Sequence, residues 1–111
     1  MAYRIFICRT DTPANAEEDP IGLQEWKNLV RDTPQVYLYE GTEALPDYIE
    51  APSPSEGLAR WAGHPQFQAV WFNHEKGYVY TVGSDSYIAM RMRTFANRLG
   101  ASVIDDNGRR Y

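Results

Sequence analysis

Two histidines and a neighbouring acid are the side chains best suited to chemistry in this chain of 111 residues. His64 lies in the stretch GHP, and His74 lies in NHEKG beside Glu75. Histidine is the commonest general acid or base in enzymes. One hypothesis is therefore a small enzyme that uses His64 or His74 with Glu75. The other interpretation, which we favour, is that both histidines are solvated turn residues.

Other catalytic and metal-binding patterns do not emerge from the spacing. The histidines are separated by nine residues with no HExxH pattern and no thiolate pair, so the sequence predicts no metal site. Cys8 falls inside a predicted buried strand with no histidine nearby, which favours a packed structural thiol. The acids at 17–19 and 105–106 are predicted to be solvated, and solvated carboxylates lack the burial that separates catalytic pKa values. We therefore expect no catalytic set and no cofactor.

The net charge of −4 conceals a difference between the two halves of the chain. Residues 1–56 contain four basic and eleven acidic side chains, whereas residues 57–111 contain seven basic and four acidic ones. An acidic surface repels a phosphate backbone, so nucleic-acid binding is disfavoured. A protein with a basic surface is the more natural partner.

The stretch from Tyr37 to Glu56 concentrates this charge, because it contains acids and tyrosines but no lysine or arginine. It is either a solvated loop and strand edge, or a docking surface with tyrosine anchors and steering acids. Under the second interpretation, the residues expected to contact a partner are Tyr39, Glu40, Glu43, Asp47, Tyr48, Glu50 and Glu56.

The N-terminal stretch MAYRIFICR is short and interrupted by Arg4, which argues against a signal peptide. No apolar run reaches the roughly 18–20 residues that a membrane span needs. The chain has one cysteine and so cannot form an internal disulfide, which suits a reducing compartment. We therefore expect a cytoplasmic protein that does not insert into a membrane.

The first half of the chain is predicted to form a strand, a helix and a second strand. Residues 3–9 are β-branched or aromatic on both faces, as in a central strand, and 10–20 is expected to be a polar loop. The helix begins with Gly22 as N-cap and Glu25 at N3, with Ile21 and Trp26 as a hydrophobic staple. It ends before Pro34, and a short strand is predicted over 35–41.

The second half is predicted to contain a hairpin, a helix and a final strand. Residues 42–57 read as a loop, and 58–63 fit either a short strand or a helical turn. Strands at 66–73 and 77–83 are joined by HEKG, and a helix capped by Ser84 or Asp85 runs to Gly100. With a last strand at 101–104, the order is β-α-β-(loop)-β-β-α-β. This order predicts a single two-layer α+β domain with a mainly antiparallel sheet.

Three segments resemble a group of small bacterial proteins of about this length: IGLQEW at 21–26, WAGHP…VWF at 61–72, and LGASVIDDNGRRY at 99–111. The resemblance spans most of the chain, but it concerns packing residues and turns. The chain departs from the group at Gly22, where the group carries serine or threonine. Such proteins are similar to immunity proteins encoded beside secreted bacterial toxins. The resemblance thus implies a partner protein rather than a substrate.

Three functions are therefore open. The first is a non-enzymatic immunity-type protein that occludes the active site of a cognate toxin. The second is an adaptor or chaperone for a secreted effector, which would leave its partner active. The third is the small enzyme that would depend on His64 or His74 with Glu75.

Overall fold

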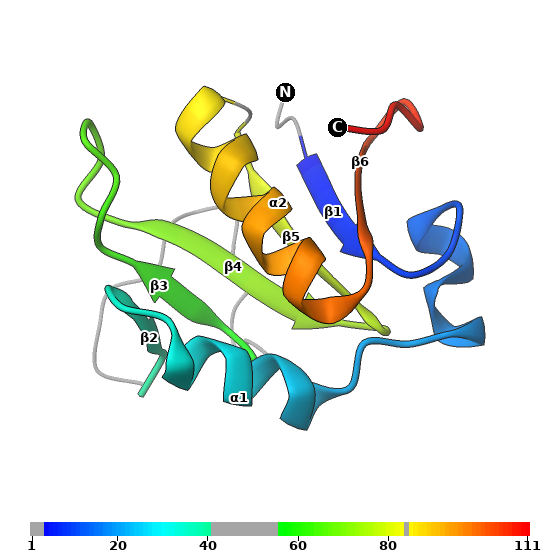
Figure 1. The fold of residues 1–111 in the computed structure, drawn as a ribbon, viewed down its shortest axis with the longest axis horizontal. Coiled ribbons are helices and arrows are strands. Elements are labelled where there is room, and N and C mark those ends of the chain that lie inside the picture. Colours follow the sequence, from blue (N-terminus) through cyan, green and yellow to red (C-terminus); the bar gives the residue numbers. More distant parts are fainter. Residues whose placement is uncertain (1–3, 41–55, 84) are drawn as a thin grey trace.

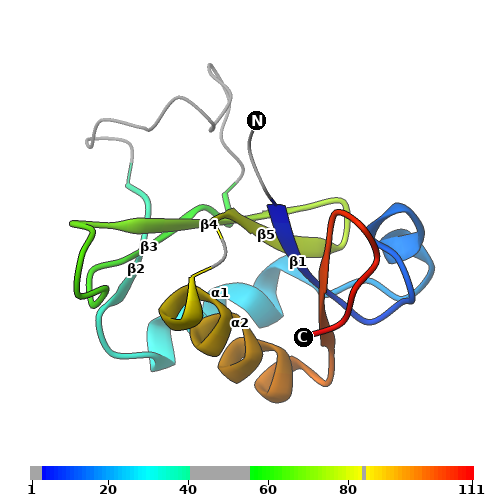
Figure 2. The same ribbon diagram turned by 90° about the horizontal axis from the view of Figure 1, so that it is seen from above.

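A computed structural model describes residues 4–40, 56–83 and 85–111, and it confirms the α+β fold, with both helices on one face of a six-stranded sheet (Figures 1 and 2). The elements are, in chain order, β1 Arg4–Cys8, the 3-10 helix η1 Pro13–Glu18, α1 Leu23–Asp32, β2 Val36–Leu38, β3 Ala59–Trp61, β4 Val70–Glu75, β5 Tyr78–Val82, α2 Ser86–Leu99 and β6 Ser102–Asp105. None of the described helices has the length and apolar character needed to cross a membrane.

The strands lie in the order β2-β3-β4-β5-β1-β6, and each neighbouring pair is antiparallel. The ambiguous segment at 58–63 is thus a strand, β3, between β2 and β4. The first strand, β1, lies between two partners, as its two apolar faces predict. Ile5 and Ile7 face the helices and belong to the main core, whereas Cys8 packs on the opposite face against Ala16 and Ile104. Cys8 is fully buried, and this burial raises the pKa of its thiol.

Helix α1 begins as predicted. The N–H of Gly22 donates to the carboxylate of Glu25 at 3.0 Å, which satisfies one of the backbone donors that a helix start leaves unpaired. Trp26, Leu29 and Val30 form the buried face of the helix. The helix ends at Asp32, two residues before Pro34, because the residue preceding a proline avoids the helical conformation.

Glu25 should give the stability a measurable pH dependence. The Arg9 guanidinium, 2.6 Å from the Glu25 carboxylate, and the Gly22 N–H together lower the pKa of Glu25 to about 2. A carboxyl with a lowered folded-state pKa stabilises the fold above its usual pKa, and this contribution is lost as the pH falls through 4.5 towards 2. The Glu25 side chain is 49% exposed, so solvent screening limits the gain to about 1 kcal/mol.

The measurement is the difference in unfolding free energy between the natural chain and Glu25→Gln, followed from pH 6 to pH 2 in steps of about half a unit. This difference should shrink as the pH falls. A difference that stays constant over the whole range would show that the Arg9–Glu25 pair does not contribute.

The β4–β5 hairpin is tighter than the sequence predicts. The expected loop HEKG is wrong, because His74 and Glu75 are the last residues of β4, and only Lys76 and Gly77 turn the chain. Both turn residues have positive φ, 50° for Lys76 and 84° for Gly77. Two successive positive φ values are the signature of a type I′ turn, whose twist matches that of the flanking strands.

Two further boundaries also differ from the sequence prediction. The polar loop at 10–20 contains η1, which begins at Pro13 and buries Ala16 against Cys8 and Ile104. The strand expected from residue 66 begins only at Val70. The backbone N–H groups of Gln66 and Phe67 donate to the His64 ring, so they are held in a turn and do not join the sheet.

Candidate functional site

His64 is buried, contrary to the predicted exposed turn, with a residue exposure of 6%. Its Nδ1 accepts the backbone N–H groups of Gln66 at 3.0 Å and Phe67 at 3.2 Å. An Nδ1 that accepts hydrogen bonds assigns the proton to Nε2, which lies 2.7 Å from the Asp85 carboxylate and donates to it. Both ring nitrogens thus have partners within the fold, and the histidine fixes the turn that follows it.

Asp85 connects this turn to helix α2. One carboxylate oxygen accepts from His64, and the other accepts the Ile88 N–H at 2.8 Å as the N-cap. Burial disfavours the charged carboxylate, but the hydrogen bonds from Ile88 and His64 outweigh it, so the pKa of Asp85 lies below its usual range. Of the two predicted caps, Asp85 is confirmed and Ser84 lies outside the described residues. Asp85 has the additional role of holding His64.

His74 and Glu75 point to opposite faces of the sheet, because neighbouring residues of a strand alternate. The His74 Nε2 donates to the Ile21 carbonyl at 2.7 Å, on the helix side. Glu75 accepts the Tyr78 hydroxyl at 3.0 Å on the other side. Burial, together with this bond to Glu75, raises the pKa of Tyr78 to about 12. The two side chains therefore do not face each other as a catalytic pair.

Asp105 is also buried, with 3% exposure, so the expectation that the 105–106 pair is solvated fails for this residue. Its carboxylate accepts the N–H groups of Asn107 at 2.8 Å and Arg109 at 2.9 Å. It therefore closes the turn that follows β6. Within the described ranges no three histidine, cysteine, aspartate or glutamate side chains group together as a metal site would require.

Of the residues expected to contact a partner, Glu43, Asp47, Tyr48 and Glu50 lie outside the described residues. Tyr39 is half-buried, and its ring centroid lies 5.9 Å from that of Trp71 in an edge-on contact. Glu40 and Glu56 are exposed.

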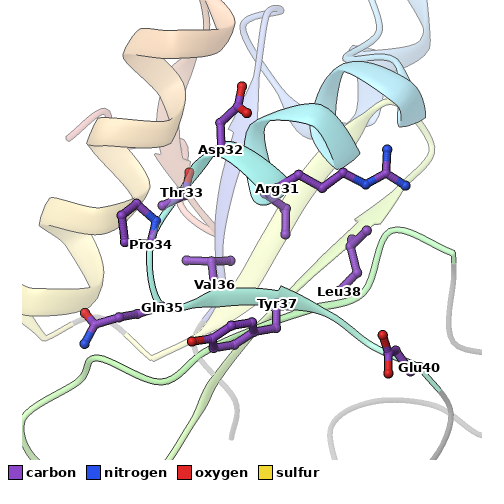
Figure 3. Close-up of a pocket in the computed structure, with 10 residues that line it drawn as sticks. Arg31, Asp32, Thr33, Pro34, Gln35, Val36, Tyr37, Leu38 and Glu40 are labelled. Atoms are coloured by element: carbon purple, nitrogen blue, oxygen red, sulfur yellow. The ribbon is translucent and has the colours of Figure 1, made fainter.

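A groove of about 870 Å³ runs between the end of α1 and β2 (Figure 3). Glu40 lines it at the end where Arg31 and Leu38 also lie, and Pro34 and Gln35 form the other end. Tyr37, between these ends, is 51% exposed, and the Arg60 guanidinium lies 5.3 Å from its ring centroid. The groove therefore combines an exposed aromatic ring with charged side chains of both signs.

The backbone of β2 adds hydrogen-bonding groups to this groove. Gln35 and Tyr39 bond to the residues that flank β3. The Ala62 N–H donates to the Gln35 carbonyl and the Tyr39 N–H donates to the Leu58 carbonyl, both at 2.8 Å. Antiparallel ladders alternate, so the N–H and C=O of Leu38 point away from β3. Among residues 4–40, 56–83 and 85–111, no strand pairs with this outer side of β2. A strand at the end of a sheet can accept an extended segment of another protein.

The opposite edge of the sheet is covered by the C-terminal tail. The N–H of Asp105 donates to the Arg109 carbonyl at 3.0 Å, and the N–H of Tyr111 donates to the Val103 carbonyl at 2.9 Å. Ile104 and Arg110 also form an isolated bridge. The two edges thus differ, because the outer side of β6 is occupied by the chain itself.

A second surface feature lies at the N-terminal end of α2 and was missed in the sequence analysis. Phe67, Tyr87 and Met90 are 52%, 49% and 64% exposed. The helical spacing could have found two of them, since Tyr87 and Met90 fall outside the buried stripe of Ile88, Met92, Phe95 and Leu99. Phe67 could not be found, because its exposure depends on the turn that His64 fixes.

Comparison of this chain with protein-family models, curated proteins and solved structures gives no match. The geometry of the chain itself therefore carries the functional proposal.

Proposed function

We propose that this protein is a non-enzymatic immunity-type protein that binds a cognate toxin and occludes its active site. The observation that carries the proposal is the position of Glu40 in the groove beside the outer edge of β2. Glu40, the first acid of the acidic stretch, therefore lies where a protein partner could also form hydrogen bonds with the backbone of β2.

The proposed partner is a toxin with a basic active-site surface, such as one that acts on nucleic acid or nucleotides in the cytoplasm. Carboxylates of the acidic stretch attract such a surface over a distance of about one Debye length, roughly 8 Å at physiological salt. Exposed Tyr37 supplies apolar contact area at the centre of the groove. The bound protein would then keep the toxin's substrate from its basic residues.

The acids can be tested by reversing charge at Glu40 and Glu56, the two exposed members of the set that the structure describes. The double variant Glu40→Lys/Glu56→Lys should bind the product of the adjacent gene about 10- to 100-fold more weakly, which corresponds to about 0.7–1.4 kcal/mol for each of the two reversed charges. The natural complex should weaken with added salt, and the variant complex should do so less.

The control is Glu17→Lys/Glu18→Lys, which changes the net charge equally but lies on η1, away from β2 in both views (Figures 1 and 2). It should retain most of the affinity. Equal losses in the two double variants would mean that only the overall charge matters, and the surface assignment would be wrong. A partner that binds but stays active would instead identify an adaptor or chaperone.

A further inference from the structure

We propose that Phe67, Tyr87 and Met90 form a second docking site, which we call the α2 patch, for a protein segment with apolar and acidic side chains. This site is independent of the acidic surface at β2, and its partner has the opposite charge preference. The inference does not depend on whether the protein neutralises a toxin.

His64 holds two of the three side chains, Phe67 and Tyr87, next to each other. The centroid of the His64 ring lies 4.5 Å from that of Phe67 and 5.5 Å from that of Tyr87. Met90 follows Tyr87 by three residues on α2, so the two lie on the same face of the helix. Single exposed apolar residues are ordinary on protein surfaces, but adjacent large ones mark interaction sites.

The patch is preorganised. His64 is buried and is bonded to Gln66, Phe67 and Asp85, so the turn at Phe67 and the start of α2 are fixed to each other. A surface that is already ordered loses less conformational entropy on binding, which favours affinity. The buried histidine thereby acts as a positioning residue for the exposed rings.

The charge around the patch selects the partner. Helix α2 contains Arg91, Arg93 and Arg98 and no acid, and the carboxylate of its N-cap, Asp85, is already bonded to His64 and to the Ile88 N–H. The Arg91 guanidinium lies 4.9 Å from the Trp61 ring centroid, and Arg93 is exposed. Aromatic residues, methionine and arginine are enriched in protein interfaces. Carboxylates in the partner would complement the arginines while apolar side chains cover the rings.

A protein segment fits better than a nucleic acid. Phosphate backbones are bound by many lysines and arginines together, whereas the chain as a whole carries a net charge of −4. Met90, the most exposed of the three, offers an apolar contact that a phosphate cannot use. The chemistry therefore points to an amphipathic acidic peptide segment.

The test is selection of a random peptide library displayed on phage against the natural protein. The enriched peptides should include a group with more acidic and apolar residues than the starting library. Synthetic copies of these peptides should bind Tyr87→Ala/Met90→Ala at least about tenfold more weakly, as expected for loss of central anchors. They should also bind Arg93→Glu more weakly, which separates the role of charge from that of apolar area.

The matched control is Tyr37→Ala, since Tyr37 is as exposed as Tyr87 but lies on β2. It should bind the selected peptides as the natural chain does. All these side chains are exposed, so melting temperatures should stay within a few degrees of the natural value.

Three outcomes would overturn the proposal. The first is an enrichment that contains no acidic, apolar peptides, or such peptides that bind the double variant as tightly as the natural chain. The second is a concentration-dependent dimer in sedimentation that Met90→Glu disrupts, because a second copy would then cover the patch. The third is saturable binding of a single-stranded oligonucleotide that the double variant loses.

Discussion

Replacing Trp26 by alanine is expected to lower the free energy of unfolding by about 3–5 kcal/mol, the range for removing a fully buried tryptophan or phenylalanine. Trp26 is 0% exposed, and its ring meets Phe95 of α2 edge-on with centroids 5.2 Å apart. Its indole N–H donates to the Gly57 carbonyl at 2.6 Å. Urea denaturation at constant pH would measure the change.

Trp26→Phe separates the two roles of this side chain. Phenylalanine keeps most of the aromatic packing against Phe95 but removes the hydrogen bond to Gly57, so the expected cost falls to about 1–3 kcal/mol. Gly57 directly follows Glu56, and an added Cβ at Gly57 would lie 2.6 Å from the His74 Cβ. The backbone at Gly57, next to Glu56, is therefore tightly packed against His74 and is held by the hydrogen bond from Trp26. A Trp26→Phe protein as stable as the natural chain would contradict this role of the indole.

The second large effect is expected at Asp85, where Asp85→Ala should lower the free energy of unfolding by about 2–4 kcal/mol. Loss of an N-cap side chain costs about 1 kcal/mol. The remainder comes from the buried His64 Nε2, whose hydrogen-bond partner the substitution removes. Thermal or urea unfolding would give the difference.

Asp85→Asn is the informative control, because its side-chain oxygen can still accept the Ile88 N–H while its amide cannot properly replace the carboxylate that faces His64. It should lose only the part of the stability that depends on His64. If Asp85→Ala cost no more than an ordinary N-cap, the pairing of His64 with Asp85 would not contribute to stability.

Local patterns predicted most of the fold. Ile88, Met92, Phe95 and Leu99 repeat at helical spacing and are all buried in α2, which ends at Gly100 with a φ of 63° as its position predicts. The Glu25 cap of α1 could be predicted because the interaction with Gly22 spans only three residues. These features depend on neighbours close in sequence, so a single sequence contains the necessary information.

The environment of the histidines could not be predicted in the same way. His64 pairs with an aspartate 21 residues away, and His74 donates to a carbonyl 53 residues away. Nothing in the residues beside them indicates these partners. The GHP context of His64 predicts a turn, and the structure has a turn there. The ring nevertheless points inward, because it forms hydrogen bonds with Asp85 and with the backbone N–H groups of Gln66 and Phe67.

Of the candidate docking surfaces, the sequence likewise predicts only the part that depends on local composition. The acidic stretch is visible in the sequence because it is a matter of composition, and Glu40 lines the groove at β2. The position of β2 at the end of the described sheet could not be seen, since it depends on the strand order β2-β3-β4-β5-β1-β6. The α2 patch likewise depends on the turn that places Phe67 beside the helix.

The most direct test of the proposed function is an inhibition titration of the adjacent gene product by this protein. The account predicts tight binding and loss of the partner's toxic activity in proportion to the protein added, complete at a fixed molar ratio. The Glu40→Lys/Glu56→Lys variant should require more protein for the same inhibition. Full toxic activity in the presence of saturating protein would contradict the immunity function, whether or not a complex forms.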